Sequence, residues 1–283
     1  MIRFSGLERK ELAASIKQDI DDACVRLFDQ SYRDHLGASV IGQECNRRIV
    51  YGFRWMHREQ FDGRMLRLFN RGHLEELRIA NWLKAASIAV FGVSQDGEQI
   101  RISANEQHYG GSLDGVGKLP PKYQIEIPFL LEMKTHNDKR FKQLVKNGVR
   151  IAKPEHFIQM SCYAQMYELQ YGIYFGINKN DDDIHVEVLE MDWQLGINHT
   201  EKARNDIYAT QLPSRIAANP AYGTCKYCPM VGVCHLGHSV DINCRSCINS
   251  VPINDQQWFC KHWNATIPKE AIPQACGEWS EFR

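Results

Sequence analysis

An apolar run that ends in two charged residues constrains the fold most. Residues 125–131 read Ile-Glu-Ile-Pro-Phe-Leu-Leu and lead directly into Glu132-Met133-Lys134. A short apolar run of this kind predicts a buried strand, which we expect over residues 124–135. Alternate residues of a strand face the same way, so Glu132 and Lys134 are expected to project into one site while Met133 points into the core. We therefore expect the fold to be built around this strand.

The rest of the pattern predicts a mixed α/β domain that ends near residues 218–220. Helical spacing of apolar residues predicts helices over about 8–29, 64–86, 138–149, 154–171 and 193–214. Further strands are expected over 88–92, 99–103, 172–177 and 184–189, the first two as a hairpin around Gln95-Asp96-Gly97. The acidic stretch 180–183 is interpreted as a second hairpin turn and not as a metal site. The expected fold class is α/β, with a mixed central sheet flanked by helices.

Charge and hydropathy limit the class of protein without naming a function. The 283 residues include 34 basic and 34 acidic side chains, so the formal charge is zero. Local basic surface matters more than this total for nucleic-acid binding. The basic residues between 134 and 153 are such a candidate surface, although a solvated helix face explains them equally simply. The chain has no apolar stretch of bilayer length and no secretory signal at its start, so we expect no membrane contact and a cytoplasmic location, in a bacterial or an infected host cell.

Two acids and a lysine at one strand end suit the hydrolysis of a phosphodiester. Asp114, within Gly111-Ser-Leu-Asp114-Gly, precedes the central strand, and Glu132 ends its apolar run. Mg²⁺ or Mn²⁺ prefers oxygen ligands, which these two carboxylates and the Met133 carbonyl offer. The Lys134 ammonium would hold a water and offset charge on the phosphate. Glu-x-Lys alone is a weak signal, and the Asp114 fragment alone is also an ordinary Asp-Gly turn.

The order of these motifs along the chain is more specific than any one of them. The ordered set is His73 on a helix, Gly111-x-x-Asp114, Glu132-x-Lys134, and Gln159-x-x-x-Tyr163 on the next helix. Over roughly residues 40–240 this set resembles the PD-(D/E)xK nuclease superfamily, within it the RecB-type exonuclease branch, and the resemblance implies a restriction-endonuclease-like core. It further implies metal ligation by His73, Asp114, Glu132 and the Met133 carbonyl, water activation by Lys134, and orientation of the site and the DNA backbone by Gln159 and Tyr163. A lone helical histidine is otherwise more often structural.

Seven of the ten cysteines follow residue 224, a pattern that favours metal ligation in a reducing compartment. The first group, C-x2-C-x5-C, supplies three thiols, whereas zinc and cubane clusters both need four ligands. From the residues alone, His235 or His238 could complete a zinc site, and Cys45 could complete either kind of site. The arrangement resembles iron–sulfur members of the RecB-type branch such as AddB. That resemblance implies a [4Fe–4S] cluster on Cys45, Cys225, Cys228 and Cys234.

The remaining cysteines predict a separate C-terminal module. Cys244, Cys247, Cys260 and Cys276 fit a Cys₄ zinc site, with His262 as an alternative ligand. In so short a segment the metal would replace a missing core. We therefore divide the chain into a nuclease domain with an iron–sulfur staple, residues 1–240, and a zinc-binding module, residues 241–283.

The function predicted on this basis is metal-dependent DNA hydrolysis, in the first place by an exonuclease of DNA recombination or processing. A small stand-alone chain without a P-loop is consistent with a phage nuclease that has no helicase of its own. A recombination or replication protein is the expected kind of partner, and the oligomeric state is not predicted. Two alternatives stay open: a structure-specific endonuclease, and a non-catalytic DNA-binding subunit whose fold is stapled by metal. A redox role for the cluster lacks any visible electron path.

Overall fold

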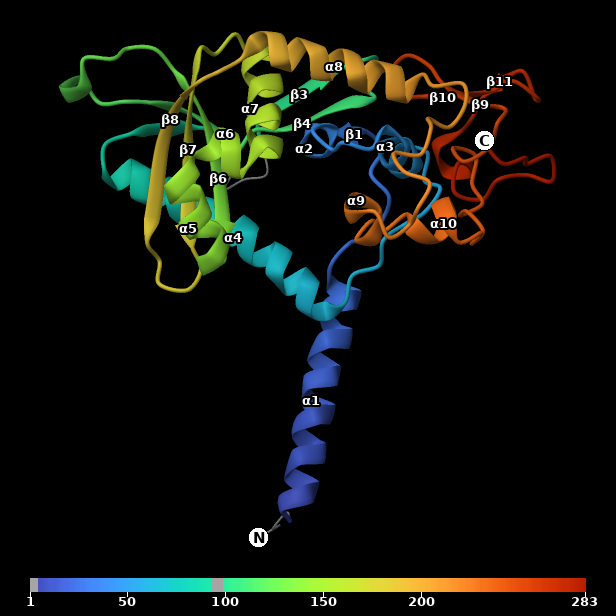
Figure 1. Cartoon of the computed structure of the whole chain (residues 1–283), viewed down its shortest axis with the longest axis horizontal. Coiled ribbons are helices and arrows are strands. Elements are labelled where there is room, and N and C mark those ends of the chain that lie inside the picture. Colours follow the sequence, from blue (N-terminus) through green and yellow to red (C-terminus); the bar gives the residue numbers. More distant parts are fainter. Residues whose placement is uncertain (1–4, 93–98) are drawn as a thin grey trace.

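The computed structural model describes residues 5–92 and 99–283, and it forms a mixed α/β fold (Figure 1). The helices are α1 (Gly6–Leu27), α2 (Ala38–Ile41), α3 (Asn46–Phe53), α4 (Gly63–Ala85), α5 (Asp138–Asn147), α6 (Val149–Ala152), α7 (Pro154–Met166), α8 (Trp193–Ile207), α9 (Gly223–Lys226) and α10 (Val231–His235). The strands are β1 (Leu36–Gly37), β2 (Ala89–Phe91), β3 (Arg101–Ala104), β4 (Tyr109–Ser112), β5 (Gly115–Lys118), β6 (Phe129–His136), β7 (Tyr171–Asn178), β8 (Ile184–Glu190), β9 (Ser250–Pro252), β10 (Trp258–Cys260) and β11 (Ala265–Thr266). Short 3₁₀ turns occupy Pro121–Tyr123 and Lys269–Ala271.

The central sheet has five strands in the order β2-β5-β6-β7-β8, and only β6 and β7 run parallel. Strand β6 is central, as the sequence predicts, but it begins at Phe129 and not at residue 124. Gln124 takes a left-handed backbone conformation, with φ of 56°, and Ile125 and Ile127 are exposed. The apolar residues before Pro128 therefore belong to a surface loop, and the strand starts later than predicted.

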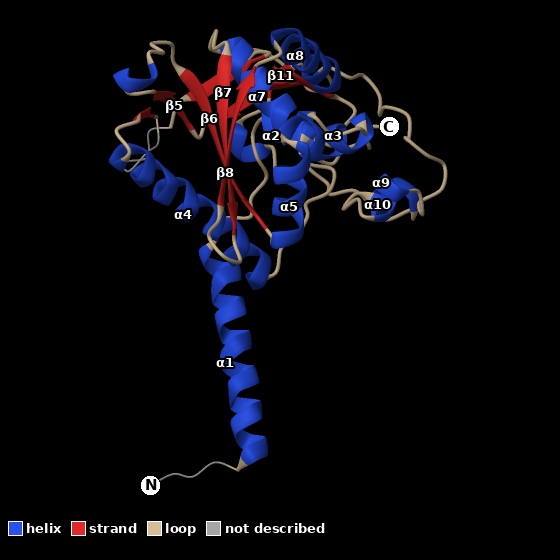
Figure 2. Ribbon diagram, turned by 60° about the vertical axis from the view of Figure 1, so that its left-hand side comes forward, coloured by secondary structure: helices blue, strands red, loops and turns tan. Residues whose placement is uncertain are grey.

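The two faces of the sheet carry different side chains, because alternate residues of β6 point to opposite sides. Leu131 and Met133 pack with Ile173 and Phe175 of β7 in a core cluster that Ile79 and Leu83 of α4 close. On the other face, Leu130 and Tyr174 belong to the larger core, which includes residues of α2, α3, α7 and α8. Figure 2 shows the sheet edge-on between α4 and α5. Glu132 lies on the same face as Leu130 and Tyr174, which is the face away from the core residues of α4.

The predicted hairpin of residues 88–92 and 99–103 is wrong. Its turn, Gln95-Asp96-Gly97, lies outside the described residues, but the strands on either side belong to different sheets. Strand β2 pairs with β5, whereas β3 pairs with β4 in a smaller sheet of order β1-β4-β3. The chain therefore changes sheets between β4 and β5, and Asp114 sits at that change. The strand with which a short apolar strand pairs is set by the packing of the core, and local sequence does not specify it.

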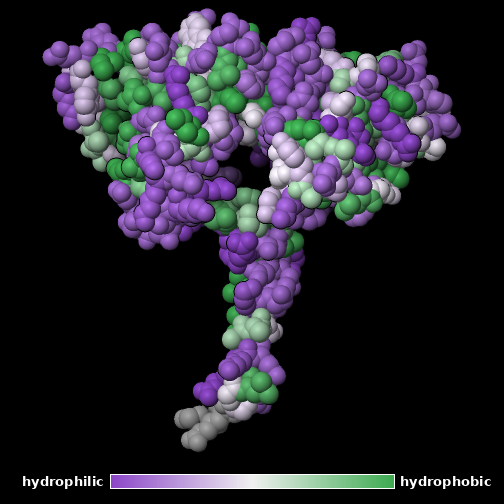
Figure 3. Space-filling view, in the orientation of Figure 1, coloured by the Kyte–Doolittle hydropathy of each residue, from purple (hydrophilic) through white to green (hydrophobic). Residues whose placement is uncertain are grey.

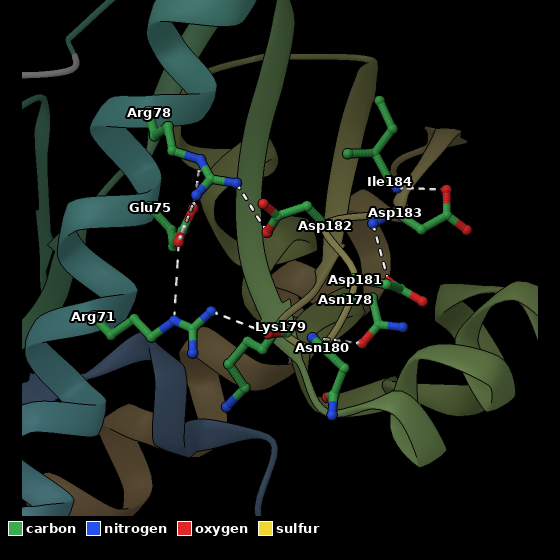
Figure 4. Close-up of polar contacts among 10 residues, drawn as sticks. All are labelled: Arg71, Glu75, Arg78, Asn178, Lys179, Asn180, Asp181, Asp182, Asp183 and Ile184. Atoms are coloured by element: carbon green, nitrogen blue, oxygen red, sulfur yellow. Dashed lines mark hydrogen bonds and ion pairs between the residues drawn. The ribbon is translucent and has the colours of Figure 1, made fainter.

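The acidic stretch after β7 is a hairpin turn, as predicted (Figure 4). Asn178 N donates to Asp183 O at 2.9 Å, and side chains within the turn cap its own backbone. Two arginines of α4 hold the turn: Arg78 Nη2 lies 3.0 Å from Asp182 Oδ1, and Arg71 Nη2 donates to the Lys179 carbonyl at 3.2 Å. The acidic side chains thus brace the sheet against α4.

Two helices end earlier than their apolar spacing predicts. Helix α7 ends at Met166 because Glu168 takes a left-handed conformation, with φ of 56°, before β7 begins. Helix α8 ends at Ile207 instead of 214, and Pro213 lies six residues beyond. Proline disfavours helix in the residue before it, which excludes a continuous helix to 214.

Residues 241–283 form a small unit around the sheet β11-β10-β9, and two buried arginines join it to the rest of the fold. Arg54 donates to the carbonyls of Arg245, Cys247 and Ser250 at 2.9, 3.3 and 3.1 Å. Arg245 reaches back to the carbonyls of Phe53 and Asp34 and lies 4.4 Å from the centre of the Trp55 ring. Charge-assisted hydrogen bonds of this kind hold the C-terminal unit in one orientation.

Helix α1 projects from the body of the molecule with its N-terminal end outermost (Figure 1). It starts with a capping box in which Ser5 Oγ accepts from Glu8 N and Glu8 Oε2 accepts from Ser5 N. Its C-terminal end packs on α4, where Arg67 pairs with Asp21 at 2.6 Å. Among the described residues, no helix has both the length and the apolar character needed to span a bilayer.

Candidate active site

The candidate site lies where β5 leaves β6. The two strands pair from Gly117–Phe129 to Gly115–Leu131, and β6 then continues with β7 on one side only. The next residue of β6 is Glu132. Asp114, which precedes β5, fills the open edge, and its Oδ2 accepts from Met133 N at 2.8 Å. The divergence of two strands thus brings the two predicted carboxylates together.

The ammonium group of Lys134 binds three of the oxygen atoms that the sequence predicts as metal ligands. Its Nζ lies 2.9 Å from Asp114 Oδ2, 2.6 Å from Glu132 Oε1 and 3.2 Å from the Met133 carbonyl oxygen. The half-buried lysine occupies the centre of this group, because a cation there offsets two carboxylates in a poorly solvated place. The three oxygens therefore converge on a single point that suits a positive charge.

The Glu132 carboxylate is fully buried and incompletely satisfied. Oε1 is held only by its ion pair with Lys134, and Oε2 has no hydrogen-bond partner among the described residues. Burial raises the pKa of Glu132 to about 8, with Asp114 and Glu76 adding to the rise and Lys134 opposing it. Burial alone would lower the pKa of Lys134, but Asp114 and Glu132 raise it well above its usual value. A buried carboxylate oxygen of this kind is a natural position for a metal ligand, so the donor set fits a hard divalent cation.

A third acid, Glu76 of α4, belongs to this group and was missed in the sequence. Burial and the charge of Asp114 together raise the pKa of Glu76 to about 7, against the opposing charge of Lys134. Glu76 also contributes to the raised pKa of Glu132. It lies three residues after His73 and therefore on the same side of the helix. That spacing was visible in the sequence, but nothing local distinguishes Glu76 from its neighbour Glu75, which pairs with arginines.

A cavity of about 1090 Å³ opens beside this group. Its lining includes His73, Glu76, Asp114, Gln159 and Tyr163, whereas Glu132 and Lys134 lie behind the lining. The side chain of His73 is exposed at the rim. A second cavity, of about 850 Å³, is also lined by His73, so the two adjoin. Figure 3 shows the surface hollowed in the middle of the molecule, above α1.

Gln159 and Tyr163 of α7 are buried on the wall of the larger cavity. The Tyr163 hydroxyl lies so close to Gly111 that a Cβ at this glycine would be 2.3 Å from it. Burial raises the pKa of Tyr163, and the charges of Glu132 and Asp114 raise it further. Gly111 is therefore required by the approach of this ring, which ties the Gly111-x-x-Asp114 motif to α7.

A buried polar cluster on the same face of the sheet continues beyond Lys134. The Tyr174 hydroxyl lies 2.9 Å from His136 Nε2 and 2.8 Å from His156 Nδ1. One O–H donates only once, so one of the two rings donates its N–H to the phenol oxygen. Burial and the positive charges of Lys153 and Arg140 together lower the pKa of His136 to about 4, and burial with the charge of Lys134 also lowers the pKa of His156. Both rings are thus neutral and serve as hydrogen-bonding groups.

The first four predicted cysteine ligands come together although Cys45 is far from the others in sequence. All four line one small cavity of about 20 Å³, with His235 beside them and with His238 outside the lining. They are Cys45, Cys225, Cys228 and Cys234. Burial raises the pKa of the Cys225 thiol, and the neighbouring thiols raise it further.

The other four cysteines also share a cavity, of about 250 Å³, with Trp263 and Trp279 in its wall. They are Cys244, Cys247, Cys260 and Cys276, and His262 is not part of the lining. Within residues 5–92 and 99–283, however, no three His, Cys, Asp or Glu side chains have an arrangement that could hold a metal ion. Two cavities are thus each lined by four thiols, but the described residues show no metal site.

Comparison with known proteins gives only distant structural matches. No family model matches the chain, and neither does any curated protein. Among solved structures, LHK-Exo, an alkaline exonuclease from Laribacter hongkongensis, matches with a TM-score of 0.44 and 16% identity over 67% of this chain and 90% of its own. The same protein in complex with dAMP matches with a TM-score of 0.45. The protein SSO0001 matches with a TM-score of 0.46 and 15% identity over 77% of this chain and 96% of its own. Scores below 0.5 at such identities carry nothing about function.

Proposed function

We propose that this chain is a divalent-metal-dependent DNA nuclease, and that it acts as an exonuclease of DNA recombination or processing. The observation that carries the proposal is the convergence of Asp114, Glu132 and the Met133 carbonyl on one positive charge. Three oxygens with a partly unsatisfied buried carboxylate are the donor set that Mg²⁺ or Mn²⁺ takes in proteins. The adjoining cavities are large enough to receive part of a nucleic-acid strand.

Each residue of the site has a distinct proposed role. Asp114, Glu132 and the Met133 carbonyl would hold the cation together with His73 from the rim, and Glu76 is an additional candidate ligand. A bound Mg²⁺ would neutralise phosphate charge and favour ionisation of a water. Lys134 would move from the acids to the attacking water or the phosphate. Gln159 and Tyr163 would fix the wall of the cavity against which the backbone of the strand lies.

The direct test is cleavage of end-labelled linear duplex DNA with Mg²⁺, with Mn²⁺ and with EDTA. We expect cleavage only with metal, and a loss of about 10²–10³-fold or more for Glu132→Gln and Lys134→Met. Glu126→Gln, at an exposed position of the loop before β6, is the matched control and should retain full activity. Metal-independent cleavage, or unchanged cleavage by Glu132→Gln, would contradict the proposal.

A covalently closed circular substrate separates exonuclease from endonuclease. An exonuclease needs an end and leaves the circle intact, whereas a structure-specific endonuclease nicks it, most readily when it carries a flap or branch. Cleavage of circular DNA by the wild type, abolished in Glu132→Gln, would replace the exonuclease by the endonuclease. Binding without any cleavage of either substrate would favour the non-catalytic DNA-binding subunit.

We also propose two structural metal centres: a [4Fe–4S] cluster on Cys45, Cys225, Cys228 and Cys234, and zinc on Cys244, Cys247, Cys260 and Cys276. The sharing of one cavity by the thiols of each set supports both proposals. Each centre would tie together segments that lie apart along the chain.

The test for the metal centres is metal content together with visible absorbance after anaerobic purification. We expect brown protein with about four irons and one zinc per chain. Cys228→Ser should lose iron and keep zinc, and Cys24→Ser, a thiol of α1 remote from both cavities, should keep both metals. Colourless protein with two zincs would assign zinc to the first centre, with His235 as the candidate ligand in place of Cys45.

A further inference from the structure

Strand β8 presents an apolar row to solvent on the side of the sheet that α4 covers elsewhere. Ile184, Val186 and Val188 are 56%, 49% and 60% exposed. In register they continue the buried row of Ile177, Phe175 and Ile173 on β7. Figure 3 shows hydrophobic residues on the lobe in which Figure 1 places β8. The core side of the sheet thus extends one strand beyond the helix that covers it.

The main chain of β8 is also open along its outer side from Ile184 to Val188, whereas at the end of the strand Arg150 Nη2 donates to the Glu190 carbonyl at 2.6 Å. The hydrogen bonds from Asn178 N to Asp183 O and from Met191 N to Gln170 O show that the peptide groups of the odd-numbered residues face β7. The peptide groups of Val186 and Val188 therefore point away from the sheet, since bonding alternates along an antiparallel strand. No described strand lies beyond β8. In Figure 2, β8 is the strand nearest the viewer, and neither α4 nor α5 crosses in front of it.

Natural proteins protect such edges with lysine, proline, bulges or short strands, because an open edge pairs with other chains. Strand β8 has seven residues and contains no lysine and no proline. Two of its titratable residues lie on the other face: His185 Nε2 is 3.3 Å from Glu187 Oε2, and Glu187 accepts from Val149 N at 2.9 Å. Glu190 shares the apolar face but lies at the end of the strand, beyond Val188. An exposed apolar row beside an open main chain marks an interaction surface.

We propose that a second copy of this chain adds its own β8 to this edge, antiparallel and centred on Val186. In this register Val186 faces the same residue of the other copy, and Ile184 faces Val188, so the apolar rows are continuous. On the opposite face His185 lies across from Glu187 of the other copy, twice by symmetry. Shifting the centre to Glu187 would instead place two glutamates against each other, which is unfavourable.

Self-pairing thereby covers the apolar row, pairs His185 with Glu187 and supplies hydrogen bonds to the open main chain. The same surface is used on both copies, as an isologous contact requires. The two five-stranded sheets become one continuous sheet with β8 at its middle. The candidate active sites, at the β5–β6 divergence, remain accessible on either side because two strands separate each from the contact. The other exposed apolar stripe, Leu12, Ile16 and Ile20 of α1, offers no open main chain and no register that would define its partner.

The experiment measures mass by sedimentation velocity over a wide range of protein concentration. We expect the wild type to reach twice the 32.7 kDa of one chain. Val186→Lys and Val186→Glu should each sediment as single chains, because like charges would meet at the symmetry axis. Val145→Lys, at a valine of α5 that is 53% exposed, is the matched control and should sediment like the wild type.

An equimolar mixture of Val186→Lys and Val186→Glu chains tests the register and excludes misfolding as the cause. Opposite charges then meet at position 186, so the mixture should regain the double mass that neither variant shows alone. A wild type that stays at the mass of one chain overturns the proposal. A dimer that survives Val186→Lys but is lost in Ile16→Asp also overturns it and moves the contact to α1. A mixture without recovery overturns the centring on Val186.

Discussion

Gly111→Ala tests whether the close approach of Tyr163 holds the candidate site together. The added Cβ would lie 2.3 Å from the Tyr163 hydroxyl oxygen and 3.2 Å from its Cζ, while ordinary contact begins at 3.4 Å. The hydroxyl must therefore move by about 1 Å, the difference between 3.4 and 2.3 Å. Tyr163 is only 3% exposed, so the ring has little room within α7's packing.

Overpacking of this kind costs about 1–3 kcal/mol of unfolding free energy. For a chain of this size that corresponds to a fall of about 2–5 °C in Tm. Urea unfolding followed by circular dichroism measures the change. The control Gly52→Ala lies within α3 with no heavy atom in reach of its new Cβ, so it should stabilise the protein by about 0.5–1 kcal/mol.

The double variant Gly111→Ala with Tyr163→Phe tests whether the hydroxyl of Tyr163 is the group that clashes with the new Cβ. Removing the hydroxyl leaves Cζ as the nearest ring atom at 3.2 Å, close to ordinary contact. We expect the double variant to be more stable than the sum of the single changes by about 1–2 kcal/mol. Strict additivity, or a Gly111→Ala protein that unfolds at the wild-type urea concentration, would refute the steric argument.

Three further predictions follow from the buried charges. Glu76→Gln should raise the Mg²⁺ concentration needed for half-maximal cleavage by at least about tenfold, as measured by metal titration. An unchanged titration curve would remove Glu76 from the site. His136 has a pKa of about 4 in the fold against 6.5 for the ordinary group, so the unfolded chain takes up the proton first and stability falls as pH drops from about 6.5 to about 4. After allowance for solvent screening the loss between pH 7 and 5 is about 1–2 kcal/mol, and urea unfolding of His136→Asn should show a shallower pH dependence. Arg245→Ala should cost about 3–5 kcal/mol, because a cavity opens among the aromatic rings and the Phe53 and Asp34 carbonyls lose their donor; a loss below 1 kcal/mol would contradict this.

Features that depend on neighbouring residues were predictable from the sequence. The placement of Glu132 and Lys134 on one face follows from strand alternation, and the structure brings them within 2.6 Å. The helix that carries His73 and the turn at residues 180–183 follow from local patterning as well. The grouping of thiols was expected from spacing and resemblance, and both sets do share cavities.

Pairing between distant segments was decided by the tertiary structure alone. The mistaken hairpin joined β2 to β3 because sequence shows which segments are strands but not which strand the core brings alongside. Glu76 enters the site because α4 packs against β6, and Gly111 is required because α7 carries Tyr163 to it. Both depend on contacts between segments far apart along the chain, whose free energy arises only when the core is packed. Local alternation thus determined which way each side chain points, and packing decided what it meets.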